Sequence, residues 1–111
     1  MPTAIDRSRG RSPEHFVYIV RCADGTLYTG YARDPGAREK AHNEGRGARY
    51  TCGRRPVSLV YSEAFERHGD ALRREQRVKR LSRARKEALV ASFHAEGQQH
   101  IAGPQPERPV A

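Results

Sequence analysis

The feature that most constrains the fold is a pair of β-rich runs joined by a short polar connection. Residues 16–20 and 27–31 are dominated by aromatic and β-branched side chains. The connection between them includes residues 22–26, which contain an Asp24-Gly25 pair. Such side chains favour strands, and Asp-Gly between two such runs is a strong hairpin signal. We therefore predict a β-hairpin over residues 16–31.

The length of the hairpin loop determines whether Tyr18 and Tyr28 share a face of the sheet. A two-residue Asp24-Gly25 turn would put the two tyrosines on opposite faces. A three-residue loop with Gly25 as a bulge residue pairs Val20 with Tyr28 and puts both tyrosines on one face. Asp-Gly tolerates either loop, but we favour the longer one because it avoids holding both Asp24 and Gly25 at positive φ.

Three helices and a third strand are expected after the hairpin. Asp34 followed by Pro35 is the pattern of an N-cap and a first-turn proline. In chain order, we predict a helix from this cap to Gly45, a strand over residues 57–61, a helix over 71 to about 81 capped by Asp70, and a helix capped by Ser82 that ends near Phe93. Because these elements do not alternate as βαβ units do, we predict an α+β domain with a small three-stranded, mainly antiparallel sheet flanked by helices.

Length and composition fit one domain with dissimilar ends. The chain has 111 residues, which is enough for a single core. Residues 1–13 lack apolar periodicity and are expected to be a flexible basic arm, while residues 94–111, rich in Gly, Gln and Pro, are expected to be a disordered tail. The predicted folded unit is 14–93. No apolar run resembles a signal peptide or a membrane span, so we expect a cytoplasmic protein in which Cys22 and Cys52 are free thiols.

The charge balance predicts a polyanionic partner. The formal net charge is +8, and arginines outnumber lysines by 18 to 3; the pattern indicates nucleic acid binding without a base-reading module. The alternative is that these charges only keep helix faces solvated. The candidate binding residues form two clusters, Arg46, Arg49, Arg54 and Arg55 around Tyr50, and Arg73, Arg77 and Arg80 on the second predicted helix.

Two helices carry candidate functional side chains. On the second predicted helix, Glu75 falls inside the apolar arc defined by Leu72 and Val78. A carboxylate that faces a core needs an arginine, ordered water or a metal ion as partner; the alternative to a site is an internal ion pair with a neighbouring arginine. On the first helix, Arg38 and His42 are four residues apart and share a face, which by itself is typical of a solvated surface.

The order and spacing of these residues resemble the GIY-YIG nuclease family. The segments Val17-Tyr18-Ile19 and Tyr28-Thr29-Gly30 match the two name-giving motifs in part, and Arg38, His42 and Glu75 follow at matching positions. Residues 45–49, followed by Thr51, resemble the basic loop of the small stand-alone bacterial members. The resemblance covers about residues 14–90, nearly the whole predicted folded unit.

The resemblance implies a metal-dependent endonuclease that hydrolyses DNA, with single-stranded, flap or junction DNA as possible substrates, and a role in repair, recombination or DNA processing. It implies that Tyr18 and Tyr28 lie near the attacking water, that Arg38 binds the scissile phosphate, and that Glu75 is the single carboxylate ligand of Mg²⁺ or Mn²⁺. His42 would orient a tyrosine or relay its proton. A phenol becomes a usable base only beside positive charge, which the metal ion and Arg38 would supply.

One departure from the family pattern keeps an alternative open. Larger members usually carry an asparagine on a later helix, whereas the only asparagine of this chain, Asn43, comes too early. The alternative is a catalytically weak or inactive nucleic-acid-binding module of the same fold. The intact Tyr18, Tyr28, Arg38 and Glu75 favour the enzyme, because a pure binder has no need of an inward carboxylate.

Overall fold

A computed structural model of the protein describes residues 13–95. The predicted arm and tail therefore lie outside the described residues, except for their innermost positions. Residues 94 and 95 belong to the last helix, so this helix extends two residues beyond the predicted end of the folded unit.

A three-stranded antiparallel sheet forms the centre of the structure, in the strand order β3-β2-β4. The strands are β2 (His15–Arg21), β3 (Leu27–Ala32) and β4 (Ser58–Phe65). The predicted α+β class with a small antiparallel sheet is confirmed. The predicted third strand was too short, because the polar residues 62 and 63 end the apolar run of the sequence. The strand nevertheless continues to pair along β2, with Phe65 opposite His15.

The hairpin has the longer of the two loops considered. Val20 pairs with Tyr28, the amide of Cys22 donates to the carbonyl of Thr26 at 2.8 Å, and Gly25 has a φ of +87°. The prediction of a three-residue loop with a left-handed glycine is confirmed. Tyr18, which pairs with Gly30, therefore lies on the same face of the sheet as Tyr28.

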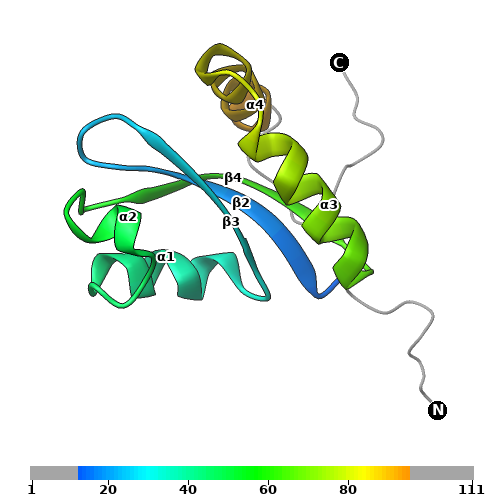
Figure 1. The fold of residues 1–111 in the computed structure, drawn as a ribbon, viewed down its shortest axis with the longest axis horizontal. Coiled ribbons are helices and arrows are strands. Elements are labelled where there is room, and N and C mark those ends of the chain that lie inside the picture. Colours follow the sequence, from blue (N-terminus) through cyan, green and yellow to red (C-terminus); the bar gives the residue numbers. More distant parts are fainter. Residues whose placement is uncertain (1–12, 96–111) are drawn as a thin grey trace.

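Helices cover both faces of the sheet. The helices α1 (Pro35–Asn43) and α2 (Arg49–Cys52) lie on one side, and α3 (His68–Lys79) and α4 (Arg83–Ala95) lie on the other, as Figure 1 shows. The Asp34 side chain accepts a hydrogen bond from the amide of Ala37 at 3.0 Å, which confirms the predicted cap of α1. Sequence periodicity did not reveal α2, because its four residues span hardly more than one helical turn.

The predicted start of α3 was wrong, and that of α4 was confirmed. Asp70 lies in the first turn of α3 rather than at its cap, and it pairs with Arg73 at 2.6 Å. An acidic residue is favourable anywhere in the first turn because of the helix dipole, so its presence does not fix the first residue. The Ser82 hydroxyl accepts a hydrogen bond from the amide of Arg85 at 3.2 Å, as expected of a cap.

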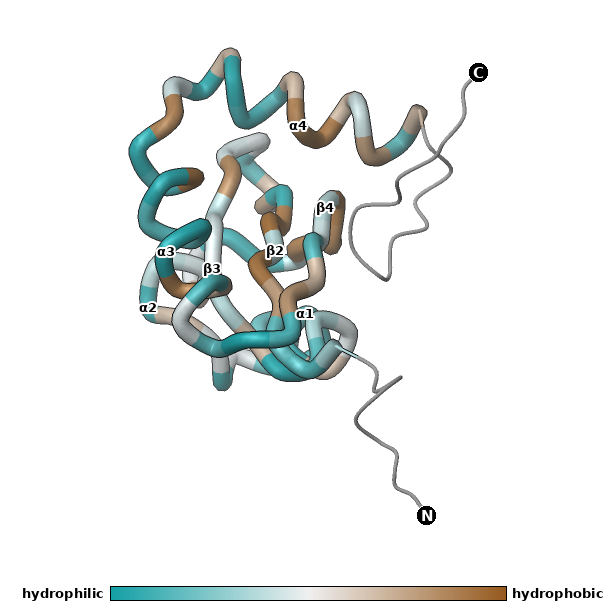
Figure 2. The backbone as a smooth tube through the Cα atoms, turned by 90° about the vertical axis from the view of Figure 1, so that its right-hand side faces the viewer, coloured by the Kyte–Doolittle hydropathy of each residue, from teal (hydrophilic) through white to brown (hydrophobic). Residues whose placement is uncertain are grey.

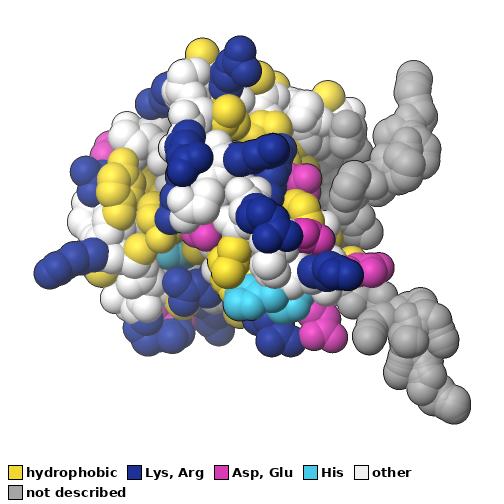
Figure 3. Space-filling view, turned by 45° about the vertical axis from the view of Figure 1, so that its right-hand side comes forward, with side chains coloured by type: hydrophobic (Ala, Val, Ile, Leu, Met, Phe, Trp, Pro, Cys, Tyr) yellow, Lys and Arg dark blue, Asp and Glu magenta, His cyan; other side chains and the backbone are white. Residues whose placement is uncertain are grey.

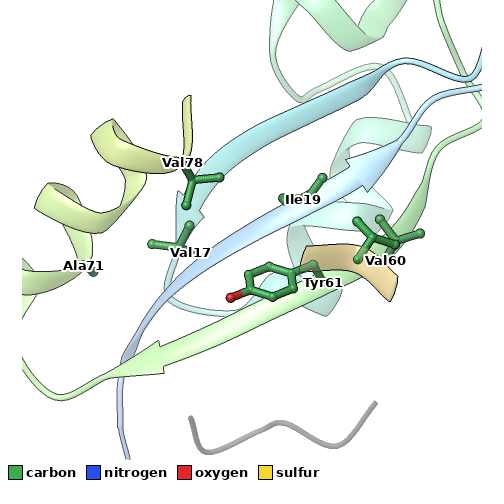
Figure 4. Packing of buried hydrophobic residues seen from close by; sticks show 7 residues of the cluster. Val17, Ile19, Val60, Tyr61, Ala71 and Val78 are labelled. Carbon is green, nitrogen blue, oxygen red and sulfur yellow. The ribbon is translucent and has the colours of Figure 1, made fainter. Parts of the chain in front are cut away.

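The sheet separates two buried clusters. On the α3 and α4 side the cluster is aliphatic and aromatic (Figure 4), and it contains Val17, Ile19, Val60, Tyr61, Ala71, Val78 and Val90. On the α1 side it contains Tyr18, Val20, Cys22, Ala32 and Val57. The hydrophobic residues of the strands and of α4 are brown in Figure 2. Leu72, expected within the apolar arc of α3, is 39% exposed, because the helix packs through Ala71 and Val78 instead.

Two further expectations concern the cysteines and membranes. Cys22 is buried and Cys52 is half-buried, and both are free thiols. Among residues 13–95, no helix has the length and apolarity needed to span a bilayer.

Candidate functional site

A buried tyrosine and a buried histidine meet beneath α1. Tyr18 is 1% exposed and His42 is fully buried, and the Tyr18 hydroxyl lies 2.9 Å from His42 Nε2. β2 supplies the tyrosine and α1 supplies the histidine. Gly30 makes room for this pair, since a Cβ at position 30 would lie 2.5 Å from the Tyr18 oxygen. The glycine of the second motif is therefore required by close packing.

The other ring nitrogen of His42 is enclosed by the loop that follows α1. Nδ1 lies 2.8 Å from the Thr51 hydroxyl and 3.4 Å from the amide nitrogen of Ala48. A Cβ at Gly47 would approach Nδ1 to 2.1 Å. The loop of residues 45–51, which looked like a basic surface loop in the sequence, thus packs directly on the imidazole.

Aromatic rings continue from the buried pair toward the surface. Tyr28 is half-buried; its ring centroid lies 6.5 Å from that of Tyr18 and 5.5 Å from that of His42. Tyr50 stacks on Tyr28 at 5.7 Å, and the guanidinium carbon of Arg54 lies 4.0 Å from the Tyr50 ring centroid. The two motif tyrosines are thus brought together, and a third tyrosine extends the group to solvent.

Opposite charges act on the Tyr18 oxygen. Burial raises the pKa of Tyr18, the nearby Arg38 guanidinium lowers it, and Tyr28 and the Glu75 carboxylate raise it further; the net shift is upward. Desolvation thus outweighs the effect of Arg38 on the Tyr18 hydroxyl. The expectation that a metal ion and Arg38 together make this phenol a base stays a prediction. Burial, reinforced by Arg38, lowers the pKa of His42, which keeps the imidazole neutral near neutral pH.

Glu75 approaches the site from the opposite layer. It lies on α3, which packs on the other face of the sheet and also contacts β3. Its side chain is 13% exposed, and its one ion pair within residues 13–95 is with Lys79, whose Nζ is 3.2 Å away and whose side chain is 45% exposed. The partner is thus a half-exposed lysine of the same helix and not a neighbouring arginine, the alternative considered from the sequence.

Comparison with known proteins identifies the family. Residues 14–88 match the model of the GIY-YIG catalytic domain. The chain belongs to the GIY-YIG family. This family is a nuclease superfamily, and the match covers the sheet, α1, α2 and α3, and with them all five residues of the candidate site.

Among GIY-YIG relatives, the similar proteins are small and bacterial. A UPF0213 protein of Staphylococcus aureus is 55% identical over 76 residues, which is 68% of this chain and 93% of the relative. The solution structure of a protein from E. faecalis is 39% identical, with a TM-score of 0.51 over 78% of this chain and 93% of that one. A UPF0213 protein from Bacillus halodurans is 50% identical, with a TM-score of 0.47 over 70% and 83%.

GIY-YIG nucleases generally use divalent metal ions, and the donor set near Tyr18 fits one kind of ion. The described residues contain no group of three or more His, Cys, Asp or Glu side chains that could enclose a metal. Mg²⁺ does not need such an enclosure, because it retains several waters and binds through one or two carboxylates together with substrate phosphate. Glu75, nearly buried and paired with Lys79, suits that mode.

The arginines expected to bind nucleic acid fall into two groups in this GIY-YIG domain. Four have partners within the fold: Arg46 with Glu44, Arg54 with Asp24, Arg73 with Asp70, and Arg55 with the carbonyls of Cys52 and Asn43. Within residues 13–95, Arg49, Arg77 and Arg80 have no ion-pair partner. Figure 3 shows Lys and Arg side chains spread over one face among a few acidic ones.

Asn43 has a structural role. Its side-chain oxygen accepts from the amide of Val57 at 2.7 Å, and its side-chain nitrogen donates to the carbonyl of Val57 at 2.9 Å. The amide group thus mimics a neighbouring strand beside the entry to β4, and it is not available to replace the late asparagine of larger GIY-YIG members.

Sequence reasoning missed the contributions of Gly47, Tyr50 and Thr51. Gly47 lies in the loop after α1, and Tyr50 and Thr51 lie in the four-residue helix α2. Neither segment is long enough for periodicity to mark which side chain turns inward. The only signal was the dense Gly-Arg-Gly-Ala-Arg-Tyr-Thr run itself, in which a glycine next to small residues permits close approach of the backbone.

Proposed function

We propose that this protein is a metal-dependent endonuclease that hydrolyses phosphodiester bonds of DNA with little sequence specificity, in repair, recombination or DNA processing. Beyond membership of a nuclease superfamily, one observation carries the proposal. The oxygen of a buried tyrosine contacts a neutral histidine and is influenced by both a guanidinium and a carboxylate. A surface that only binds nucleic acid has no use for such a buried set of groups.

Arg38 is the residue that we assign to the scissile phosphate. It is half-buried on α1 and acts electrostatically on both Tyr18 and His42. A guanidinium donates two parallel hydrogen bonds to phosphate oxygens, and its positive charge stabilises the negative charge that develops on them. Because Arg38 has no ion pair with a carboxylate among the described residues, it can make these bonds without breaking an internal ion pair.

Glu75 is the residue that we assign to the metal ion, Mg²⁺ or Mn²⁺. A bound divalent ion would supply positive charge to the phosphate oxygens and to the nucleophilic water. The contribution of the chain is to keep one carboxylate nearly buried and near enough to act electrostatically on Tyr18. A bound phosphate would complete the ion's ligands.

Tyr18, Tyr28 and His42 are the residues that we assign to the attacking water. Burial keeps Tyr18 a neutral phenol, so it accepts a proton from water only as it releases its own. His42 Nε2, 2.9 Å away, is the group positioned to receive that proton. Tyr28 is the more exposed tyrosine, and we assign it to orienting the water or the substrate.

The low sequence specificity follows from the charged surface. The described residues offer arginines without ion pairs at the start of α2 and near the end of α3, and their guanidinium groups suit phosphate contacts rather than base edges. Arg77 and Arg80 lie about 140–160° around α3 from Glu75 at 100° per residue. They would therefore contact a strand that passes over the helix, away from the scissile bond.

A second candidate is a nucleic-acid-binding module of the same fold with little or no turnover. The observation in its favour is that Asn43, the only asparagine, is fully engaged with the backbone of Val57. The loss of one polar group from a metal site leaves binding intact and lowers turnover.

One experiment distinguishes the endonuclease from the binding module. The purified full chain is incubated with end-labelled single-stranded, duplex and flap DNA, and with the matching RNA, in the presence of Mg²⁺, Mn²⁺ or EDTA. We expect internal cleavage of DNA with either metal and none with EDTA. Binding of the same oligonucleotides without cleavage under any of these conditions would favour the binding module.

A further inference from the structure

The buried hydrogen-bonded pair of Tyr18 and His42 continues to a third residue, Thr51. All three side chains are 1% exposed or less, and the Thr51 hydroxyl lies 2.8 Å from His42 Nδ1. Thr51 belongs to α2, and its hydroxyl has no hydrogen bond to either motif tyrosine. It is therefore placed to act on Tyr18 only through the imidazole.

The number of available protons determines which group donates in each hydrogen bond between Tyr18, His42 and Thr51. The Thr51 hydroxyl has a single proton and donates it to the carbonyl oxygen of Ala48 at 2.8 Å, since a carbonyl can only accept. The contact with His42 must then be a hydrogen bond from Nδ1–H to the Thr51 oxygen. With the imidazole neutral, Nε2 carries a lone pair that accepts the Tyr18 hydroxyl proton.

A competing contact favours the opposite tautomer but is weaker. The Ala48 amide would donate to an unprotonated Nδ1, at 3.4 Å. Hydrogen bonds of this length are at the limit of the usual range, whereas the Thr51 contact at 2.8 Å is near its optimum. Removal of the hydroxyl should therefore leave the amide contact to decide the tautomer.

We propose that Thr51 is a positioning residue that holds His42 in the Nδ1–H tautomer, so that Nε2 can take the Tyr18 proton during hydrolysis. The proposal rests on the proposed nuclease function. In the step, the water O–H bond breaks and its proton goes to the Tyr18 oxygen, while the Tyr18 proton goes to Nε2. The water oxygen forms the new bond to phosphorus as the P–O bond to the leaving deoxyribose oxygen breaks. That leaving oxygen takes a proton from solvent, and the imidazolium later returns its own proton to solvent.

A hydroxyl suits this position better than a carboxylate would. Arg38 acts electrostatically on both His42 and Tyr18. Tyr28 and Glu75 act on Tyr18, and the Tyr28 ring also contacts the His42 ring. A carboxylate at position 51 would raise the pKa of His42 and keep the imidazole protonated before the reaction. The threonine orients the ring without adding charge, which leaves Nε2 free to accept a proton.

The tautomer can be measured without any nuclease assay. Two-bond ¹⁵N–¹H correlation spectra of the full chain distinguish Nδ1–H from Nε2–H for a neutral histidine. We expect the Nδ1–H form of His42 in the unchanged protein and in Thr51→Ser, and the Nε2–H form in Thr51→Val. An Nε2–H form in the unchanged protein overturns the proposal, and this outcome does not depend on whether Thr51→Val folds.

The consequence for catalysis is tested by pH profiles of cleavage for the same proteins. We expect Thr51→Ser to retain the rate, and Thr51→Val to lose about 10–100-fold in kcat, the usual cost of losing a partner that orients a catalytic group. The acidic limb of the profile, set by protonation of His42, should also change in Thr51→Val, with DNA binding unchanged. Thr26→Val, which removes a hydroxyl bonded to Asp24 in the hairpin loop, is the matched control.

The outcomes separate this proposal from the proposed function. If Thr51→Val switches the tautomer but keeps the rate and pH profile of the unchanged protein, the proposal is wrong while the nuclease stands. If neither the unchanged protein nor any Thr51 variant cleaves DNA, the proposed function is wrong. The proposed proton transfer from Tyr18 to His42 is then wrong too, even when the tautomers are as expected.

Discussion

The side of the sheet covered by α1 and α2 buries a hydrogen-bonded series of side chains, whereas the side covered by α3 and α4 buries mainly aliphatic and aromatic ones. Adjacent positions of β2 illustrate the difference: Val17 and Ile19 pack with Ala71 and Val78, while Tyr18 joins His42. On the second side, the buried Tyr61 hydroxyl donates to Glu63 at 2.8 Å, and the ion pair of Arg21 with Glu87 lies at the more exposed margin.

The apolar side of the sheet mainly stabilises the fold, whereas the polar side carries the candidate functional groups. Aliphatic packing stabilises the fold without directional requirements, whereas a buried polar chain costs desolvation unless each group finds its partner. The polar side is therefore the one that needs close-packed glycines at Gly30 and Gly47. α3 belongs to both sides, because it contributes Ala71 and Val78 to the apolar cluster and Glu75 to the site.

The largest expected change in stability comes from matched substitutions on the two faces of β2. Val17→Ala and Val20→Ala each remove two methyl groups from a fully buried side chain, and each should cost about 2–3 kcal/mol of unfolding free energy. Only Val20→Ala, which lies beside Tyr18 and Tyr28, should also lower DNA cleavage per folded molecule. Urea unfolding and cleavage assays check both. Equal loss of cleavage in the two variants would mean that the faces are not functionally distinct.

The next effect concerns the loop over His42. Gly47→Ala introduces a Cβ 2.1 Å from Nδ1, so the loop or the imidazole must move, at a cost of about 1–3 kcal/mol. Gly53→Ala is the matched control, since its Cβ meets nothing within 4 Å. Thermal unfolding and cleavage should both suffer in Gly47→Ala alone. If both variants behave like the unchanged protein, the loop is not packed on the imidazole as described.

A smaller effect is expected at the margin of the apolar side. Hydrogen bonds from Arg21, with help from Arg83, lower the pKa of Glu87 from 4.5 to about 2. Folding is thus favoured by this carboxylate above pH 4.5, and the contribution disappears as the pH falls to about 2. Because Glu87 is 34% exposed, solvent screening keeps the contribution modest. Melting temperatures should fall less steeply with acid in Glu87→Gln, whereas parallel curves would mean that Arg21 does not stabilise the carboxylate.

The smallest expected effect distinguishes free from paired arginines. If Arg49 or Arg77 contacts a phosphate, Arg49→Gln or Arg77→Gln should reduce the log–log salt slope of DNA affinity by about 0.7–0.9. Arg73→Gln, whose arginine already pairs with Asp70 at 2.6 Å, should change it less. Fluorescence anisotropy between about 50 and 200 mM salt measures the slopes. Equal slopes in all proteins would show that these charges only solvate the surface.

The sequence predicted the elements whose signals are local. Turn chemistry at Asp24 and Gly25 gave the hairpin register, and with it the shared face of Tyr18 and Tyr28. Helical periodicity gave the inward position of Glu75, although the arc is centred nearer Ala71 and Val78 than Leu72. Helical periodicity gives the directions of side chains relative to one another, but only the packing of the helix against the sheet determines which direction faces the interior.

The remaining features depend on contacts between distant segments. Thr51 and Gly47 reach His42 because the loop folds back over α1, and no spacing rule predicts that path. Which arginines are paired also depends on the fold, since Arg54 meets Asp24 across 30 positions of sequence. The sign of the shift in the pKa of Tyr18 depends on burial, which the sequence could not weigh against the charge of Arg38.

The measurement that tests the central claim most directly compares Glu75→Gln with Lys79→Gln in metal-dependent DNA cleavage. Glu75→Gln keeps the shape but removes the ligand charge, and we expect cleavage to fall at least about 100-fold while DNA binding is kept or slightly strengthened. Lys79→Gln breaks the same 3.2 Å ion pair but keeps the carboxylate, so it should cleave. If Glu75→Gln cleaves DNA like the unchanged protein and melts several degrees lower, as Lys79→Gln then also should, Glu75 is a structural ion-pair partner and the metal site is elsewhere.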